Sequence, residues 1–548
     1  MPTFKYDGTE IPFQPGETII KAAYRLGIEI PHYCWHPGLS APANCRMCLV
    51  EIAPPPNQKA LMLDILEWDA AKNDYVPTRK PKLQPACQMA AVEGMDVRGD
   101  TSEHVKEARK GVQEFLLLNH PVDCPICDQS GECKLQDYWL EHGQYQKRMR
   151  DEPVHKPKAV EFGPTIVYDA ERCVMCTRCI RFMDEVAMDP VLDMRERGNL
   201  NEIFVAPDRQ LDGNYTLMTE HVCPVGALTS KDFRFKARVW FLRTAKTVCQ
   251  GCATGCSAHL DFDPRNNKAY RYRPRDNEAV NHYWMCDPGM LTYKLAHENR
   301  VLEPSVRKDG KAEGRVTSPQ KALDAAKKLL ASVPRESIAL LLSAQHSSED
   351  NWALKELGAT LLGSAQFFAT GQATGFSDKI LIHRDKNPNT KGMVELMPTV
   401  KPFADLIDDA KAGRITHVIA LGGATPGDQE ADIIGLATLK CLVVIAAHEG
   451  PLTAAAHVVL PAASWAETSG TYVNYKGVRQ VTEKGLVMQG ACLPAWQQIA
   501  ELGRAMGLDA SWTKLRHVRE RMAPPAPVGN PNPPPNAQPN TPEGGISP

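Results

Sequence analysis

The cysteines of this chain are gathered in its first half and are spaced in the manner of metal ligands. All but two of the 17 cysteines in the 548 residues lie before residue 287. Together with one histidine they form four sets of four side chains: Cys34, Cys45, Cys48 and Cys87; His120, Cys124, Cys127 and Cys133; Cys173, Cys176, Cys179 and Cys223; and Cys249, Cys252, Cys256 and Cys286. Thiolates and imidazoles bind iron–sulfur clusters and zinc. The pattern therefore predicts an iron–sulfur electron carrier.

Disulfide bonds and zinc are the alternative uses of these thiols. A disulfide between cysteines two residues apart would close too short a loop to stabilise much. An odd number of cysteines also suits a reducing compartment better than a disulfide framework. Zinc is the stronger alternative for any single set, because C-x2-C pairs also build structural zinc sites. Three of the sets place a third cysteine within the next six residues, and this favours clusters.

Composition limits the cellular compartments and the kinds of binding partner that we expect for this chain. The formal net charge is -2, which gives no overall electrostatic reason to bind nucleic acid. The N-terminus, MPTFKYDGTE, has no basic region followed by an apolar stretch, and no apolar run approaches the roughly 20 residues that span a bilayer. We expect a cytoplasmic chain that meets a membrane only through a larger complex.

The second set is unusual because it includes His120. A lone histidine at the end of a helix, here expected over residues 101–119, usually bonds to the backbone. This histidine is followed by cysteines at positions +4, +7 and +13, and without it the set would have an open position. An imidazole in place of a thiolate removes one negative charge, which favours the reduced cluster, as in Rieske centres. We therefore predict that His120 is a ligand.

The third set can be interpreted by comparison with the cluster-binding motifs of ferredoxins. In two-cluster ferredoxins, the motif C-x2-C-x2-C-x3-C-P gives three ligands to one cluster and its last cysteine to the other. Here Cys223-Pro224 stands in the place of the second motif's end, but the positions four, seven and ten residues earlier are Thr219, Thr216 and Gly213. The prediction is a ferredoxin-like fold that keeps one [4Fe–4S] cluster and has lost the other.

The first set follows a segment that looks like a β-grasp ferredoxin. Residues 4–6 and 11–13 around Asp7-Gly8 predict a hairpin, and residues 17–26 predict a helix that ends at Gly27. The ten-residue first gap resembles the [2Fe–2S] domain shared by respiratory complex I, NAD-linked hydrogenases and some formate dehydrogenases. We expect the charged, Pro-rich stretch 53–81 to be an inserted surface loop.

The chain after Cys286 has a different sequence pattern. Short apolar runs at 338–342, 417–421 and 442–446 alternate with helical patterns such as 351–362. This alternation predicts a mostly parallel, doubly wound sheet.

Four other features of the sequence after Cys286 give little or no indication of a chemical function. Gly422 and Gly423 follow one expected strand, but a glycine pair is weak support for a phosphate loop. Cys441 and Cys492 lie in apolar segments, so we expect them in the core. Residues 523–548 are rich in Pro, Asn and Gly, a composition typical of disorder.

The order of these features resembles the large iron–sulfur subunits of bacterial NADH:quinone oxidoreductase, respiratory complex I. The resemblance covers about residues 3–520. It rests on the segments HPVDCPICDQSGEC, RCVMCTRCIRF, CPVGAL and LPAASWAETSGTYVNYKGVRQ. It implies a [2Fe–2S] cluster on the first set and [4Fe–4S] clusters on the other three, the last lying off the main electron route.

The resemblance also implies a multidomain α+β and α/β fold. The expected domains are a β-grasp [2Fe–2S] domain (1–100), a helical histidine/cysteine cluster domain (101–150), a ferredoxin-like [4Fe–4S] domain (151–245), an all-cysteine [4Fe–4S] subdomain (246–300), a molybdopterin-oxidoreductase-like α/β domain without an active site (301–522) and a disordered tail (523–548). We expect no molybdenum or pterin, and the last folded domain is shorter than its family suggests.

The function implied is electron relay rather than catalysis at a substrate site. No dinucleotide fingerprint or flavin site is recognisable, so hydride chemistry is expected on a partner flavoprotein that binds NADH and FMN. Electrons would pass through this chain towards quinone, and the whole complex would translocate protons. The other expected partners are peripheral-arm subunits, on the cytoplasmic side of the inner (plasma) membrane.

Three rival interpretations share parts of this pattern. A molybdenum or tungsten formate dehydrogenase would need a metal-binding residue early in a full pterin domain, and no cysteine lies between Cys286 and Cys441. The domain after residue 300 can also be interpreted as an assembly scaffold without a redox role. The diaphorase subunit of soluble NAD-linked hydrogenases resembles only the front portion and ends before this domain.

Overall fold

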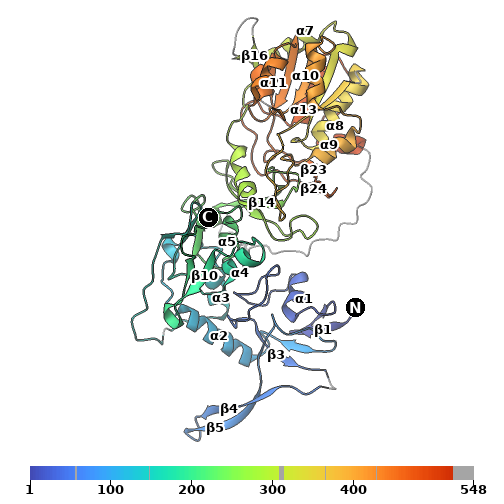
Figure 1. The fold of residues 1–548 in the computed structure, drawn as a ribbon. Coiled ribbons are helices and arrows are strands. Elements are labelled where there is room, and N and C mark those ends of the chain that lie inside the picture. Colours follow the sequence, from blue (N-terminus) through green and yellow to red (C-terminus); the bar gives the residue numbers. More distant parts are fainter. Residues whose placement is uncertain (56–57, 147, 308–313, 364–365, 428, 523–548) are drawn as a thin grey trace, which may run out of the picture. The chain divides into compact units, whose positions relative to one another are not determined.

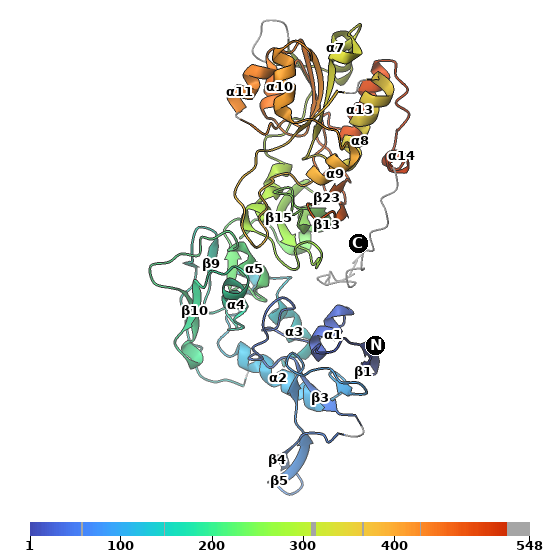
Figure 2. The same cartoon turned by 45° about the vertical axis from the view of Figure 1, so that its right-hand side comes forward.

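The computed structural model describes residues 1–522 except 56–57, 147, 308–313, 364–365 and 428. The predicted tail, 523–548, lies outside the described residues. The chain forms two compact units, one of residues 1–240 and a second that begins at Phe241 (Figures 1 and 2). Within the described residues, no helix combines the length and the apolar character needed to cross a bilayer.

The first unit opens with the predicted β-grasp arrangement. Its sheet has the order β2-β1-β7-β3-β6, formed by β1 (Thr3–Tyr6), β2 (Thr9–Pro12), β3 (Leu49–Ala53), β6 (Gln84–Pro85) and β7 (Asp96–Arg98). Asp7 and Gly8 turn the first hairpin with positive φ angles, as a tight two-residue turn requires. Helix α1 (Ile19–Arg25) begins at Thr18, whose side chain accepts a hydrogen bond from the Lys21 N–H. The predicted hairpin and helix are confirmed.

The stretch predicted as a surface loop, 53–81, was wrongly assigned. Most of it forms an antiparallel hairpin of β4 (Met62–Asp69) and β5 (Asp74–Pro81), in which Trp68 lies opposite Tyr75 (Figure 1). From Asp64 to Asp69, exposed and half-buried residues alternate along β4, because successive side chains of a strand point to opposite faces. The prolines of β5 are compatible with this hairpin because both strands of a two-stranded sheet are edge strands, where proline is tolerated.

Helices α2 (Glu103–Leu117) and α3 (Lys134–His142) follow. The existence of α2 is confirmed. Its buried face is not purely apolar, because Phe115 is 77% exposed whereas Arg109 and Gln113 are fully buried. Both buried polar groups have partners: Arg109 donates to Asp100 at 2.6 Å, and Gln113 donates to the Tyr33 hydroxyl at 2.5 Å. Hydrogen bonding of this kind is what allows such groups to be buried.

The remainder of the first unit builds the predicted ferredoxin-like part. One sheet has the order β12-β9-β8 and a second pairs β10 with β11. The elements are β8 (Val160–Glu161), β9 (Ile166–Tyr168), α4 (Arg178–Glu185), β10 (Leu192–Arg195), β11 (Glu202–Val205), α5 (Leu217–Val222) and β12 (Leu228–Ser230). Strands β9 and β12 pair antiparallel, with Tyr168 opposite Leu228. This pairing brings the cysteines before α4 close to the end of α5.

The second unit starts with an antiparallel sheet of β13 (Arg243–Val248), β14 (Ser257–Asp263) and β15 (Lys268–Pro274), followed by α6 (Asp287–Leu291). A seven-stranded sheet with the order β17-β16-β22-β21-β20-β18-β19 forms the rest. Its strands are β16 (Ser305–Arg307), β17 (Gly314–Val316), β18 (Ile338–Ser343), β19 (Gln366–Thr370), β20 (His417–Leu421), β21 (Cys441–Ala446) and β22 (Val458–Pro461). The five strands from β19 to β22 in this order pair in parallel.

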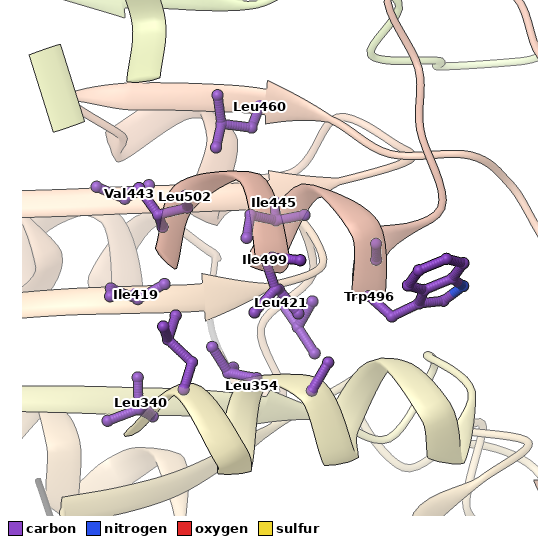
Figure 3. Close-up of a cluster of buried hydrophobic side chains, with 14 of the residues drawn as sticks. Leu340, Leu354, Ile419, Leu421, Val443, Ile445, Leu460, Trp496, Ile499 and Leu502 are labelled. Carbon is purple, nitrogen blue, oxygen red and sulfur yellow. The ribbon is translucent and has the colours of Figure 1, made fainter. Parts of the chain in front are cut away.

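Helices cover both faces of this sheet (Figure 2), as the α/β prediction requires. On one face lie α7 (Pro319–Leu330), α8 (Ser348–Glu356) and α13 (Ala495–Ala505); on the other lie α10 (Phe403–Lys411), α11 (Gln429–Leu436) and α12 (Pro451–Ala455). Figure 3 shows Leu340, Ile419 and Val443 of the strands against Leu354 and Leu502 of the helices. Cys441 belongs to the same core.

The glycine pair after β20 has a packing role. A Cβ on Gly423 would lie 2.4 Å from the backbone oxygen of His448, so only glycine allows the two segments to approach. The next helix, α11, begins at Gln429 rather than directly after the pair. The feature is therefore not the strand, loop and helix of a phosphate-binding motif.

Gln480 connects the C-terminal half of the second unit to the loop before β14. Its side-chain N–H donates to the Gly255 carbonyl at 2.7 Å, and its side-chain oxygen accepts from the Ser257 hydroxyl at 2.5 Å. Gln480 lies on β24 (Arg479–Val481), which pairs with β23 (Thr471–Val473). Segments more than 220 residues apart in sequence are thus joined by buried hydrogen bonds.

We expect Gln480→Ala to lower the thermal stability of the second unit. Each buried partner that loses its hydrogen bond costs about 1–3 kcal/mol. Differential scanning calorimetry should show a lower transition temperature than for Gln320→Ala, a control at an exposed site of α7. Equal transition temperatures for the two variants would show that these bonds contribute little.

Candidate metal centres

The second predicted set lines one cavity. His120, Cys124, Cys127 and Cys133 all contribute to its wall. His120 follows α2, and Cys133 immediately precedes α3, so two helix ends bring the set together. Burial, followed by the charge of Arg172, lowers the pKa of His120 to about 4. The imidazole is therefore neutral near pH 7, which is the form that binds metal.

The third predicted set also lines a cavity of its own. Cys173, Cys176, Cys179 and Cys223 all contribute to its wall. Cys179 belongs to α4, and Cys223 ends α5. Met175 and Thr177 have φ angles of 51° and 61°, so the backbone between the ligands turns sharply back on itself. Burial raises the pKa of Cys173 and Cys223 to about 11.

The first predicted set is arranged as two pairs. The Cys34 thiol is hydrogen-bonded to Cys45, and the Cys48 thiol to Cys87. The bond from Cys34 lowers the pKa of Cys45 below the usual value for a thiol, which favours the thiolate form that binds metal. Cys87 lies in the turn after β6. Two pairs of thiols match the needs of a two-iron cluster, whose irons each take two protein ligands.

The fourth predicted set lies at the start of the second unit. Cys249, Cys252 and Cys256 occupy the loop between β13 and β14, and Cys286 precedes α6 with its sulfur accepting the Gly289 N–H at 3.4 Å. All four are buried. A Cβ on Gly289 would lie 3.1 Å from the sulfurs of both Cys249 and Cys286. Glycine therefore lets α6 approach the ligands.

The donor sets fit iron–sulfur clusters better than zinc. Within the part of the chain that is described, no three His, Cys, Asp or Glu side chains converge on a point that could hold one metal ion. Zinc–sulfur bonds of about 2.3 Å would require sulfurs roughly 3.8 Å apart. The second and third sets instead surround cavities, which suits a cluster because iron and sulfide atoms lie between its ligands.

Gly226 stands between the second and third cavities. It lines the second cavity, whereas its neighbours Val225 and Ala227 line the third. A Cβ on Gly226 would lie 2.3 Å from the Cys127 sulfur. The segment that follows Cys223 thus separates the two cavities, and the absence of a side chain at Gly226 keeps this separation thin.

Two arginines of α4 join the first and third sets. Arg181 donates to the Cys34 carbonyl at 2.5 Å and to the Cys176 carbonyl at 3.3 Å. Arg178 donates to the Trp35 carbonyl at 2.5 Å and to the Val222 carbonyl at 3.3 Å. The third set therefore has the first set as one neighbour and the second as the other.

Sequence reasoning did not identify these connecting residues. Arg178 adjoins Cys179, and Arg172 adjoins Cys173. A basic residue beside a predicted ligand was therefore the only feature of the sequence that could have pointed to them. Their partners are distant in sequence and could not be inferred. The two cysteines outside the sets are buried, as predicted; Cys492 donates to the Val301 carbonyl at 3.3 Å.

Family models match successive parts of the chain. They are described as a 2Fe-2S iron-sulfur cluster binding domain (1–102), the NADH-ubiquinone oxidoreductase-G iron-sulfur binding region (109–148), the ferredoxin-like domain of NADH-quinone oxidoreductase subunit 3 (163–229), the molybdopterin oxidoreductase Fe4S4 domain (242–298) and molybdopterin oxidoreductase (302–505). The chain thus contains 2Fe-2S and 4Fe-4S iron–sulfur domains, in the order predicted from the sequence.

Individual relatives belong to one enzyme. The NADH-quinone oxidoreductase G subunit of Mycobacterium bovis is 34% identical over 66% of this chain, and subunit 3 of the Thermus thermophilus enzyme is 34% identical over 64%. The chain spans 42% and 45% of those two proteins, less than half their length. The G subunit of the Rickettsia felis enzyme is 29% identical over 94% of this chain and 89% of its own length. The chain is thus homologous to G subunits of NADH-quinone oxidoreductase, the group of proteins that its sequence resembles.

Proposed function

We propose that this chain is an electron-transfer subunit of a NADH:quinone oxidoreductase. The observation that carries the proposal is that complete predicted ligand sets line single cavities, as His120 and three cysteines do. Bound iron–sulfur clusters would accept and release one electron at a time. The protein would hold them, tune their potentials and exclude water.

The proposed cofactors are one [2Fe–2S] cluster and three [4Fe–4S] clusters. The first set would hold the two-iron cluster through its two pairs of thiols, and the other three sets would hold the four-iron clusters. No molybdenum or pterin is proposed in the α/β domain. For the fourth set we propose a position off the main electron route, with a role in stabilising the second unit.

The proposed partners are a flavoprotein that binds NADH and FMN and other peripheral-arm subunits, on the cytoplasmic side of the inner (plasma) membrane. Hydride transfer from NADH would occur on the flavoprotein, and quinone reduction and proton translocation elsewhere in the complex. The proposed domain boundaries are those predicted from the sequence. The family matches, which end near residues 102, 148, 229, 298 and 505, support them.

The anaerobically prepared protein should contain about 14 irons per chain, because one two-iron and three four-iron clusters sum to that number. Chemical analysis of iron and acid-labile sulfide, together with low-temperature electron paramagnetic resonance of the reduced protein, would measure this. His120→Ala should alter the resonance of the second centre alone. Cys441→Ala, a buried cysteine outside the sets, is the control and should leave iron and spectra unchanged. A zinc-loaded, sulfide-free protein would refute the proposal.

Gly226→Ala should damage the second centre. The added methyl group would meet the Cys127 sulfur at 2.3 Å, so either the ligand or the wall between the cavities must move. We expect loss of about four irons, the content of one such cluster, or a changed spectrum of the histidine-ligated centre. Gly213→Ala is the matched control, because its Cβ would lie no closer than 3.6 Å to another residue. The idea fails if both variants keep native spectra.

A further inference from the structure

An ion pair lies in the wall of the second cavity. Arg172 donates to the Asp123 carboxylate at 3.0 Å, and both residues line the cavity together with His120 and the three cysteines of the set. The Arg172 side chain is only 7% exposed, and that of Asp123 is 23% exposed. A charged pair in this position faces the interior of the cavity more than it faces water.

The backbone fixes both charges relative to the proposed ligands. Asp123 immediately precedes Cys124 of the second set, and Arg172 immediately precedes Cys173 of the third. The two side chains therefore cannot move far without moving a ligand. Their pairing also connects the loop of one set with the loop of the next.

Other charged groups surround the pair and must be counted with it. The Asp169 carboxylate lies 3.3 Å from Arg172 Nε. Lys158 lies 2.7 Å from Asp123, 3.5 Å from Asp169 and 2.8 Å from Glu171. The cluster thus has two cations and three carboxylates. Of these, Arg172 and Asp123 are the ones that line the cavity.

Arg172 has an unused donor. Its Nη2 is paired with Asp123, but its buried Nε forms no hydrogen bond within the described structure, because the nearby Asp169 carboxylate does not meet it in hydrogen-bonding geometry. Leaving a buried donor without an acceptor is unfavourable. A thiolate or sulfide in the adjoining cavity would supply an acceptor, and hydrogen bonds to cluster sulfurs raise reduction potentials.

We infer that Arg172 and Asp123 set the reduction potential of the second centre, with Arg172 raising it and Asp123 lowering it. The inference rests on the proposed function, because it requires a cluster on His120, Cys124, Cys127 and Cys133. Reduction adds a negative charge to a cluster. A nearby cation stabilises the reduced state, a nearby carboxylate destabilises it, and solvent screens such buried interactions only weakly.

The test is a redox titration of the whole protein, followed by electron paramagnetic resonance, for the wild type, Arg172→Gln, Arg172→Lys, Asp123→Asn and the Arg172→Gln/Asp123→Asn double variant. For Arg172→Gln we expect at least a tenfold shift of the second centre towards its oxidised form, or about 59 mV for one electron. Asp123→Asn should shift it the opposite way. The double variant should lie between the single ones, and Arg172→Lys should retain part of the wild-type potential.

Control variants distinguish a local effect on the reduction potential from general damage to the protein. Arg209→Gln removes an arginine that is half exposed and paired with Asp189 in the same unit, and it should leave every potential unchanged. The third centre should move less than the second in all variants. Iron analysis is done first for each protein.

The outcomes distinguish the inference from the proposed function. A wild-type protein without iron on the second set would refute the proposed function. Full iron with an unmoved or oppositely shifted second centre in Arg172→Gln would overturn the inference alone. If Arg172→Gln loses its iron, Asp123→Asn decides: an unchanged potential in that variant overturns the inference.

Discussion

Crowding of buried thiols is the constraint on which the rest of the structure depends. Ligand cysteines such as Cys179 and Cys256 lie in the interior, where burial and neighbouring thiols raise their pKa well above the ordinary value. Thiolates in this position would repel each other without a positive counter-charge. Bound iron would supply it, so cluster binding and the stability of these sites are linked. Cys45 is the exception, because its hydrogen bond from Cys34 lowers its pKa.

The fold meets this constraint by placing many of the proposed ligands at or near the ends of helices. Cys133 precedes α3, Cys223 ends α5 and Cys286 precedes α6. At such positions the backbone can turn, and unpaired N–H groups at a helix start can face sulfur. The connections between sites then come from single side chains, as when Arg181 bonds carbonyls of both Cys34 and Cys176.

The features predictable from sequence were those encoded by local pattern. The hairpin around Asp7-Gly8 and the parallel sheet depend on residue patterns along the chain. The hairpin in 53–81 was missed because the stretch is rich in prolines and charges and because the residues of β4 do not alternate between polar and apolar. The burial of Arg109 in α2 could not be predicted, because Arg109 is stabilised by Asp100, a partner that periodicity does not reveal. Arg172 escaped notice for the same reason, since its importance lies in what it approaches in space.

The α/β domain is joined by direct hydrogen bonds to the loop of the fourth set, so its fold contributes contacts to that site. Segments far along the chain bond directly to the loop of the fourth set: Ala253 donates to the Asp385 carbonyl at 2.9 Å, Tyr475 donates to the Ala253 carbonyl at 2.9 Å, and Thr254 donates to the Leu381 carbonyl at 2.6 Å. Each is a bond that a truncated chain would lose. A scaffold role for the domain therefore does not separate it from the iron sites. It makes the loop of the fourth set dependent on residues that lie outside the set.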